Sequence, residues 1–479
     1  MGYIKRIRAL KIKNIETNTI KNIATAIRSG DLSATEIAEW SIANRQDRGE
    51  VLDAYKTWDS HRFLTEARAV DSVFATGIDL GLFQGIPVSI KDLYGVSGYP
   101  TFAGCPRELT KKWQSEGPVV RALRHQLAVV SGKTHTVQFA FGALGTNVHW
   151  GTPRNPWDSN DHRVPGGSSA GAGVSLWEGS ALIALGSDTA GSVRMPASFT
   201  GTVGLKTSKG RWSTSGIVPL SHTLDTAGPL TRNIADSISA FSVIDPFVSQ
   251  SPNDFYRRLE TADISDFKIG VCDWYFNDCD PGVAEGVMSA LSELEKSGAR
   301  ISAVDYTEIE ESNALFKKGG LSAPEFASFI NNEMLEFKED LDPNVAGRFN
   351  VMESVEANEY IARCNYRLQL ASKMQDSMFG FDAIVGPTIA ISPPTLSEVA
   401  ESKEYHRKNM AASRNTSTVN MLDLCAVSMP VALDAINMPV GLHIISQHGK
   451  DEKLLAIALT FEKVLGSARE RIGIPPLCK

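Results

Sequence analysis

The 479-residue sequence lacks the cysteine and histidine patterns that mark metal centres. Its six cysteines are scattered without a C-x-x-C pair, and its nine histidines show no H-E-x-x-H spacing. In a chain of this length, isolated cysteines indicate reduced and mostly buried thiols. We therefore expect no metal ion, no zinc knuckle and no cofactor.

Long apolar runs are also missing. No stretch reaches the roughly 18 uninterrupted apolar residues that a membrane-spanning helix needs. No apolar segment follows the basic residues near the N-terminus, as it would in a secretory signal. These absences predict a soluble, cytoplasmic protein that does not associate with a membrane.

The charge balance offers no large surface for nucleic acid. Charged residues make up 22% of the chain and leave a net charge of −7, with both signs well mixed. This balance fits small neutral substrates better than nucleic acid. The exception is a basic N-terminal segment, interpreted as a solvated and partly frayed end, in which Glu16 is the one acidic residue among Lys5, Arg6, Arg8, Lys11, Lys13, Lys21 and Arg28.

The sequence does contain a succession of short apolar runs that end in glycine, serine or proline. This texture is typical of strands in a sheet covered on both faces, with functional loops at the strand ends. Runs of this kind occur at 86–90, 127–132, 181–187, 381–390 and 438–446. Residues 240–375 are richer in charge and in helical periodicity, so we expect a more variable helical cover there. The pattern predicts an α/β protein whose single sheet is built from distant segments, within one domain over 1–479.

Two local patterns resemble known catalytic motifs but lack the required context. The stretch SGKTH at 131–135 looks like the end of a phosphate loop, yet Leu127 stands where that motif needs glycine. Gly167, Ser169 and Gly171 satisfy the G-x-S-x-G pattern of a nucleophile elbow, although no hydrophobic strand precedes them directly. The elbow stays an alternative, with Asp382 and His443 in the order that a triad would need.

A third candidate is the stretch ALIALGSDTAGS, which reads as a strand followed by a loop of small residues ending at Ser192. The backbone N–H groups of Thr189, Ala190 and Gly191 would curl around the same point and could form an oxyanion hole. A serine nucleophile needs a base, and a lysine can serve if burial lowers its pKa. Lys91, at the end of the strand-like 86–90 run, could be that base or could form an ion pair with Asp92.

Taken together, several segments resemble the amidase signature family, serine hydrolases that cleave amide bonds with a Ser–cis-Ser–Lys triad. The matching segments are 85–105, 129–158, the RVPGGSSAGAG stretch at 163–173, 185–232, 386–388 and 438–458. The resemblance implies the amidase signature fold, a central mixed sheet flanked by helices on both faces. The resemblance also divides the single domain into two parts. The signature core comprises about 60–235 together with 376–470, and the more variable helical cover comprises about 240–375.

The resemblance also implies roles for individual residues. Ser192 would be the nucleophile, Lys91 the base, and Ser168 the bridging serine, which follows a cis peptide bond. Asp188 and Arg194 would orient the nucleophile loop by hydrogen bonds. Substrate-lining positions are implied at Ala140, Phe141 and Gly142. Alanine stands at 170 and 190 where glycine is more frequent in the family, which should trim space without changing the chemistry.

The sequence therefore predicts an amidohydrolase that cleaves a carbon–nitrogen bond of a small amide, carbamate, anilide or urea derivative without metal or cofactor. A homodimer is compatible with this interpretation. Two rival hypotheses remain. One is a glutaminase-like component of a tRNA-dependent amidotransferase, which would need partner chains and an ammonia channel. The other is a catalytically silent binding protein, against which the intact Lys91, Ser168 and Ser192 argue.

Overall fold

The computed structural model describes residues 15–248, 252–352 and 355–479. The basic residues from Lys5 to Lys13 lie outside the described residues. Lys21, another residue of the basic N-terminal segment, is described, and its Nζ lies 4.2 Å from the ring centre of Tyr256. Among the described residues, no helix has the length and apolar character needed to cross a membrane.

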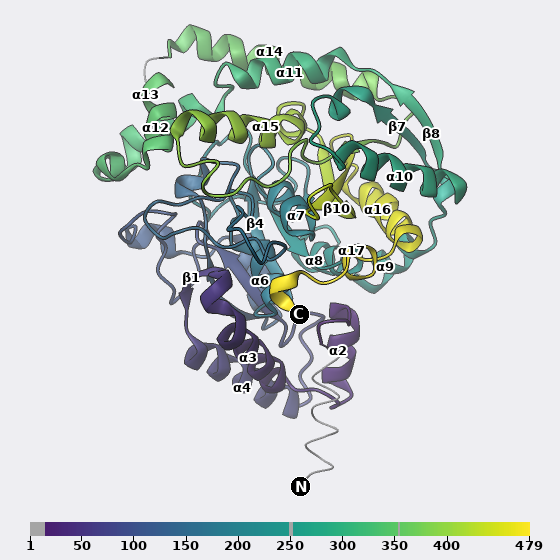
Figure 1. Ribbon diagram of the computed structural model, residues 1–479. Helices are drawn as coiled ribbons and strands as arrows, with labels where there is room; N and C mark the ends of the chain where they lie inside the picture. Colours follow the sequence, from purple (N-terminus) through teal and green to yellow (C-terminus); the bar gives the residue numbers. More distant parts are fainter. Residues whose placement is uncertain (1–14, 249–251, 353–354) are drawn as a thin grey trace.

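An eleven-stranded sheet runs through the middle of the molecule, with helices packed around it (Figure 1). The strand order is β1-β3-β2-β4-β6-β5-β10-β11-β9-β7-β8. Parallel pairs join β2 to β3 and β4, and β7 to β8 and β9, whereas the other pairs are antiparallel. The strands are β1 Tyr55–Trp58, β2 Pro87–Lys91, β3 Val129–Thr134, β4 Ile183–Asp188, β5 Val203–Lys206, β6 Thr226–Thr231, β7 Lys268–Cys272, β8 Arg300–Val304, β9 Ala383–Pro387, β10 Cys425–Leu433 and β11 Pro439–Ser446.

Helices cover this mixed sheet, so the predicted α/β class is confirmed. The α-helices are α2 Ile20–Arg28, α3 Ala34–Leu52, α4 Ser60–Ala75, α5 Pro118–His125, α6 Ala172–Glu178, α7 Arg194–Thr200, α8 Ile234–Ile244, α9 Pro252–Glu260, α10 Val283–Lys296, α11 Thr307–Lys317, α12 Ser322–Glu333, α13 Pro343–Met352, α14 Ala357–Ser377, α15 Ser402–Met421, α16 Asp451–Leu465 and α17 Ala468–Ile472. In Figure 1, α11 to α15 lie together at one end, and α3 and α4 lie at the other.

The expected helical cover at 240–375 is only partly helical. Two strands, β7 and β8, occur within it and extend the sheet beyond β9. The sequence signal for β8 is weak because all five of its residues keep some exposure to solvent, so it shows little apolar alternation. The middle of the chain is therefore joined to the core by backbone hydrogen bonds as well as by helix packing.

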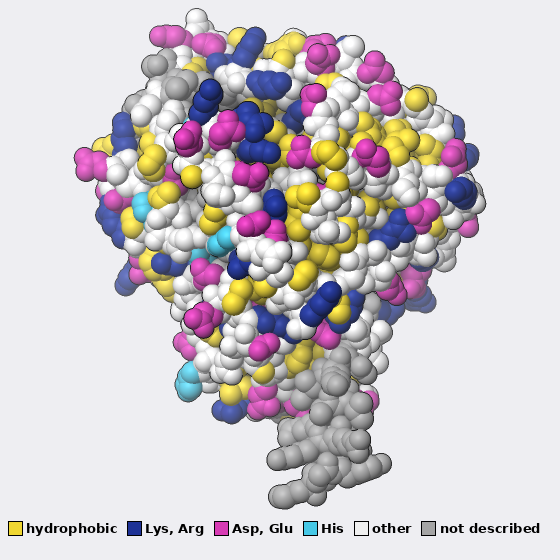
Figure 2. Space-filling view, viewed as in Figure 1, with side chains coloured by type: hydrophobic (Ala, Val, Ile, Leu, Met, Phe, Trp, Pro, Cys, Tyr) yellow, Lys and Arg dark blue, Asp and Glu magenta, His cyan; other side chains and the backbone are white. Residues whose placement is uncertain are grey.

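Acidic and basic side chains alternate over the face of the molecule that Figure 2 shows. Neither sign gathers there into a broad area, which is the mixed distribution that the composition indicates. Apolar side chains lie between the charged ones, as on most folded proteins.

Candidate active site

Lys91 is the last residue of β2, and its side chain is completely buried. Burial disfavours the ammonium form and lowers the pKa of Lys91 to about 7, although the charges of Asp225 and Asp188 act in the opposite direction. Its Nζ lies 2.7 Å from the Oγ of Ser168 and 2.9 Å from the Oγ of Ser187. The strand thus places an amine that is partly neutral near pH 7 beside two hydroxyl groups.

The alternative ion pair between Lys91 and Asp92 does not form. The Oδ1 of Asp92 instead lies 2.9 Å from the Nζ of Lys133, and both side chains are buried. Lys91 is the last residue of β2, whereas Asp92 lies in the turn that follows and directs its carboxylate to Lys133. Lys91 is therefore available to the serines.

Ser168 and Ser169 lie between β3 and α6 and point to different partners. The peptide bond between Gly167 and Ser168 is cis, as the family resemblance implies. Ser169 is fully buried, and its Oγ donates to the carbonyl oxygen of Ser192 at 2.5 Å while its N–H donates to the same oxygen at 3.3 Å. Ser169 thus fixes the backbone of Ser192, and Ser168 faces Lys91.

This geometry argues against the nucleophile-elbow alternative. Ser169 has no exposed surface, whereas an elbow serine must present its hydroxyl to substrate. The other two members of that triad lie elsewhere: Asp382 pairs with the Nζ of Lys453 at 2.7 Å, and the Nε2 of His443 lies 3.0 Å from Nη1 of Arg194. None of the three side chains contacts another member.

The loop that carries Ser192 connects β4 to α7 and is anchored by a buried ion pair. The carboxylate of Asp188 accepts from Nε and Nη2 of Arg194 at 3.0 and 2.9 Å, and from Nδ2 of Asn420 at 2.9 Å. Burial alone would raise the pKa of Asp188, but the Arg194 charge and these hydrogen bonds hold it well below its usual value. Asp188 and Arg194 thus hold the loop, as predicted.

Gly191 occupies a position that no other residue fits. Its φ of +122° is a conformation that L side chains rarely adopt, and an added Cβ would lie 2.1 Å from the Oγ1 of Thr416 on α15. That hydroxyl donates to the carbonyl oxygen of Ala190 at 2.7 Å. Helix α15 therefore packs directly against the loop that carries Ser192.

The three predicted oxyanion donors are not equivalent. The amide of Gly191 already donates to the Oδ1 of Asp188 at 2.8 Å, so it is not free for an oxyanion. Within the described residues, the amides of Ala190 and Ser192 have no hydrogen-bond partner. The side chain of Thr189 donates to Asp225 at 2.5 Å, which fixes the start of the turn.

A narrow cavity of about 40 Å³ opens in front of Ser192. The three predicted lining residues, Ala140, Phe141 and Gly142, form one wall of it. Met195, Leu220 and Phe316 add apolar surface, while Arg348 and Asn409 add polar groups. Residues from the signature core and from the middle of the chain therefore share one cavity.

Sequence reasoning missed two residues of this site. Ser187 contacts Lys91 from the neighbouring strand β4, a position that the predicted strand at 181–187 already contains. Arg348 reaches the cavity from α13, for which no local pattern gave a signal. Gln138 joins the loop after β3 to the segment before α13. Its side chain hydrogen-bonds to the carbonyl oxygen of Asp340 at 2.8 Å and to the backbone amide of Asp342 at 2.6 Å.

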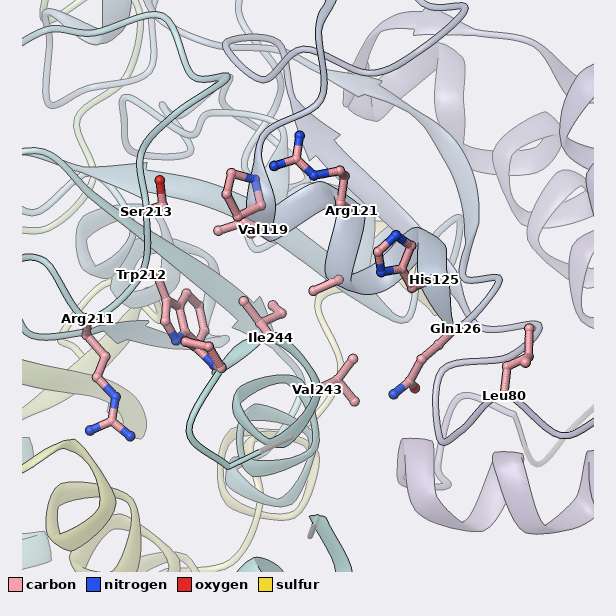
Figure 3. Close-up of a pocket in the computed structure, with 13 residues that line it drawn as sticks. Leu80, Val119, Arg121, His125, Gln126, Arg211, Trp212, Ser213, Val243 and Ile244 are labelled. Atoms are coloured by element: carbon pink, nitrogen blue, oxygen red, sulfur yellow. The ribbon is translucent and has the colours of Figure 1, made fainter. Parts of the chain in front are cut away.

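A larger surface hollow lies apart from this cavity, between α5, α8 and the segment around Trp212 (Figure 3). Arg121 and His125 line it, but none of the predicted site residues does. Among the described residues, no cluster of three or more histidine, cysteine, aspartate or glutamate side chains could hold a metal ion.

Comparisons with known proteins agree with this geometry. The family model described as Amidase matches residues 36–455. The 2-amino-5-chloromuconic acid deaminase of Comamonas testosteroni is 43% identical over 455 residues, which cover 95% of this chain and 97% of that protein. A glutamyl-tRNA(Gln) amidotransferase subunit from Gloeobacter violaceus is 29% identical over 93% of this chain and 96% of its own length. A crystal structure of an amidase superposes with a TM-score of 0.83 at 28% identity, covering 94% of this chain and 100% of that one.

Fold and comparisons together define an enzyme that hydrolyses carbon–nitrogen bonds other than peptide bonds. The chain belongs to the amidase signature family. The amidotransferase component is the more distant match of the two named relatives, so the amidohydrolase prediction stands over its rival.

Proposed function

We propose that the protein hydrolyses small amides through an acyl-enzyme on Ser192, with Lys91 as general base and Ser168 as the proton relay. The observation that carries this proposal is the 2.7 Å contact between Nζ of Lys91 and Oγ of Ser168. A neutral lysine draws a proton from Ser168, which takes one from Ser192 as its oxygen attacks the carbonyl carbon. The relay then returns a proton to the departing amine, and water hydrolyses the acyl-enzyme.

The oxyanion of the tetrahedral intermediate would be held by backbone amides of the same loop. Because the amide of Gly191 is occupied, the proposal leaves it out and rests on the predicted amides of Thr189 and Ala190, together with the amide of Ser192. Fixed amide donors stabilise developing negative charge without reorganising during the reaction. Alanine at 190 supplies the same N–H as glycine would.

The substrate class follows from the bond that a serine nucleophile attacks. Primary amides, anilides, carbamates (as in a urethanase) and ureas all present a carbonyl bonded to nitrogen, and Ala140, Phe141 and Gly142 would contact the acyl side. The Comamonas testosteroni relative is named a deaminase, so substrates that release ammonia belong in any panel. All six cysteines are free thiols, which supports a cytoplasmic site of action.

A fluorophosphonate probe tests the nucleophile assignment. The purified protein is labelled, digested and mapped by peptide mass spectrometry, alongside Lys91→Ala and the exposed-lysine control Lys403→Ala. We expect the label on Ser192 in the wild type and the control, and its loss in Lys91→Ala. A label on Ser169 that persists without Lys91 would restore the elbow alternative. A protein that takes up no label would instead support the silent binding protein.

A further inference from the structure

The cavity in front of Ser192 has one charged side chain among its lining residues, and that charge is positive. Arg348 supplies it from α13, whereas no aspartate or glutamate lines the cavity. The other polar side chains there are serines, a threonine and Asn409. The cavity therefore presents a net positive charge to whatever occupies it.

The Arg348 guanidinium is held in place by neutral groups. Its Nη2 donates to the carbonyl oxygen of Phe141 at 2.5 Å, and its Nε donates to the carbonyl oxygen of Asn344 at 3.3 Å. Its Cζ lies 4.2 Å from the ring centre of Phe141. Within the described residues, no carboxylate oxygen lies within 4.0 Å of it, and Tyr405 is the other side chain that hydrogen-bonds to it.

The guanidinium of Arg348 is partly buried, and among the described residues no carboxylate lies within ion-pair distance of it, so the charge of Asp342 acts on it only from farther away. Burial lowers the pKa of Arg348, yet an arginine keeps its charge at any physiological pH. The Phe141 and Asn344 carbonyls engage Nη2 and Nε, and Tyr405 also bonds the guanidinium, whose five N–H groups leave capacity for a further acceptor. A carboxylate is the acceptor that matches a guanidinium best in charge and in geometry.

Asn409 offers a second donor to the same space. Its Oδ1 accepts from the amide of Ala143 at 2.7 Å, which fixes the orientation of the side-chain amide. That orientation leaves Nδ2 as the group that can donate into the cavity. Arg348 on α13 and Asn409 on α15 thus provide N–H donors from two helices that pack on each other.

We infer that Arg348, assisted by Asn409, binds a carboxylate of the substrate, so that the enzyme acts on small amides that carry a carboxylate away from the scissile bond. This inference rests on the proposed function, because it takes the Ser192 cavity as the substrate site. Arg348 and Ser192 line the same cavity, so a short acyl chain would join the carboxylate to the scissile carbonyl. Hydrolysis of such a monoamide releases ammonia and a dicarboxylate.

Dicarboxylates are therefore product analogues, and their binding can be measured without turnover. Calorimetry on Ser192→Ala compares malonate, succinate, glutarate and adipate with the corresponding neutral diamides. We expect at least one diacid to bind at least about 30-fold more tightly than its diamide, because the guanidinium is paired only by the acid. Equal affinity of the diacids and the diamides would overturn the inference, and this comparison needs no substitution at Arg348.

Substitutions then test whether Arg348 is the group that binds the diacid. Arg348→Gln in the Ser192→Ala background should weaken the best diacid at least about 30-fold while leaving the diamide within about threefold, and Arg348→Lys should fall between. Arg407→Gln on α15, an exposed arginine paired with Glu404, is the matched control and should bind like the parent. If Arg348→Gln binds the diacid as tightly as the parent does, or loses diacid and diamide equally, Arg348 has a structural role only.

The fluorophosphonate experiment on the wild type distinguishes failure of the carboxylate site from failure of the proposed acyl-enzyme mechanism. Labelling of Ser192 that no diacid slows would leave the proposed function intact and overturn the carboxylate site. Labelling that the best diacid slows at least about tenfold places the acid in front of Ser192. Diacid binding that depends on Arg348 in a protein that takes up no label would support the carboxylate site and overturn the acyl-enzyme.

Discussion

At the scale of single residues, Lys91 shows how burial favours the neutral form of a common basic side chain. The side chain is fully buried at the end of β2, and the desolvation cost falls on its charged form alone. Its contacts are the hydroxyl groups of Ser168 and Ser187, which solvate a neutral amine as well as a charged one. The carboxylates of Asp225 and Asp188 keep the pKa of Lys91 from falling further.

This predicts the pH dependence of the reaction. Because only the neutral amine accepts a proton, kcat/KM should rise about tenfold per pH unit below about pH 7 and level off above it. Initial rates between pH 5.5 and 8.5 measure this rise of kcat/KM. The substrate is a neutral amide, so its own charge does not change over this pH range. The control Lys403→Ala should keep the profile. A rate that stays constant down to pH 5.5 would show that Lys91 is not the base.

At the scale of elements, the strand–loop–helix unit from β4 to α7 depends on the pair of Asp188 and Arg194. Both side chains have no exposed surface, and Asn420 from α15 bonds each of them. Removing one partner of a buried ion pair leaves the other charge uncompensated, which costs more than the pair itself contributes. The nucleophile loop is therefore sensitive to the charge beneath it.

Arg194→Met should lower the free energy of unfolding by about 3–5 kcal/mol at pH 7. The folded-state pKa of Asp188 is depressed, so its contribution is present above the unfolded pKa of about 3.8 and is lost only as pH falls through the lower folded value. In the variant, Asp188 protonates more readily, and the difference from wild type should narrow when urea unfolding is repeated at pH 4.5. Arg407→Met, which breaks an exposed pair, should change stability by less than about 1 kcal/mol. Equal losses in both variants would contradict this account.

The elements that local sequence could predict are those with a strong pattern of their own. The runs at 86–90 and 181–187 became β2 and β4, and Ser33 and Glu36 form a capping box that begins α3. Strands β5 and β10 pair across more than 200 residues, and β10 contains Pro430 at a register shift. Their strand character comes from partners that no local window contains.

The candidate site also contains residues that local sequence could predict and one that it could not. Lys91, Ser168 and Ser192 stand in short motifs at strand ends, so a resemblance could identify them. Arg348 has no motif because its position depends on how α13 packs against the loop after β3. The contacts that place it there, between Gln138 and the backbone of Asp340 and Asp342, join residues about 200 positions apart.

At the scale of the whole molecule, an aromatic cluster joins the signature core to the middle segment. Phe326 on α12 is fully buried, and its ring centre lies 5.0 Å from that of Phe141 and 5.8 Å from that of Phe139. Phe349 on α13 contacts it from the other side, at 6.4 Å. Since Arg348 rests on the Phe141 ring and both residues line the cavity, the cluster supports the cavity wall.

Phe326→Ala should therefore separate binding from chemistry. Truncating a buried phenylalanine lowers the free energy of unfolding by about 3–5 kcal/mol, and the loosened wall should raise KM. The pH dependence near pH 7 should not shift, because the pKa of Lys91 is set by its burial and by the nearby charges of Asp225 and Asp188, not by the aromatic cluster. The matched control is Phe379→Ala, whose side chain is 89% exposed and whose loss should change stability by less than about 0.5 kcal/mol. Urea unfolding and steady-state kinetics measure both variants. A shifted pH dependence in Phe326→Ala would mean that the middle segment acts on the base itself, and unchanged stability would mean that the two segments pack independently.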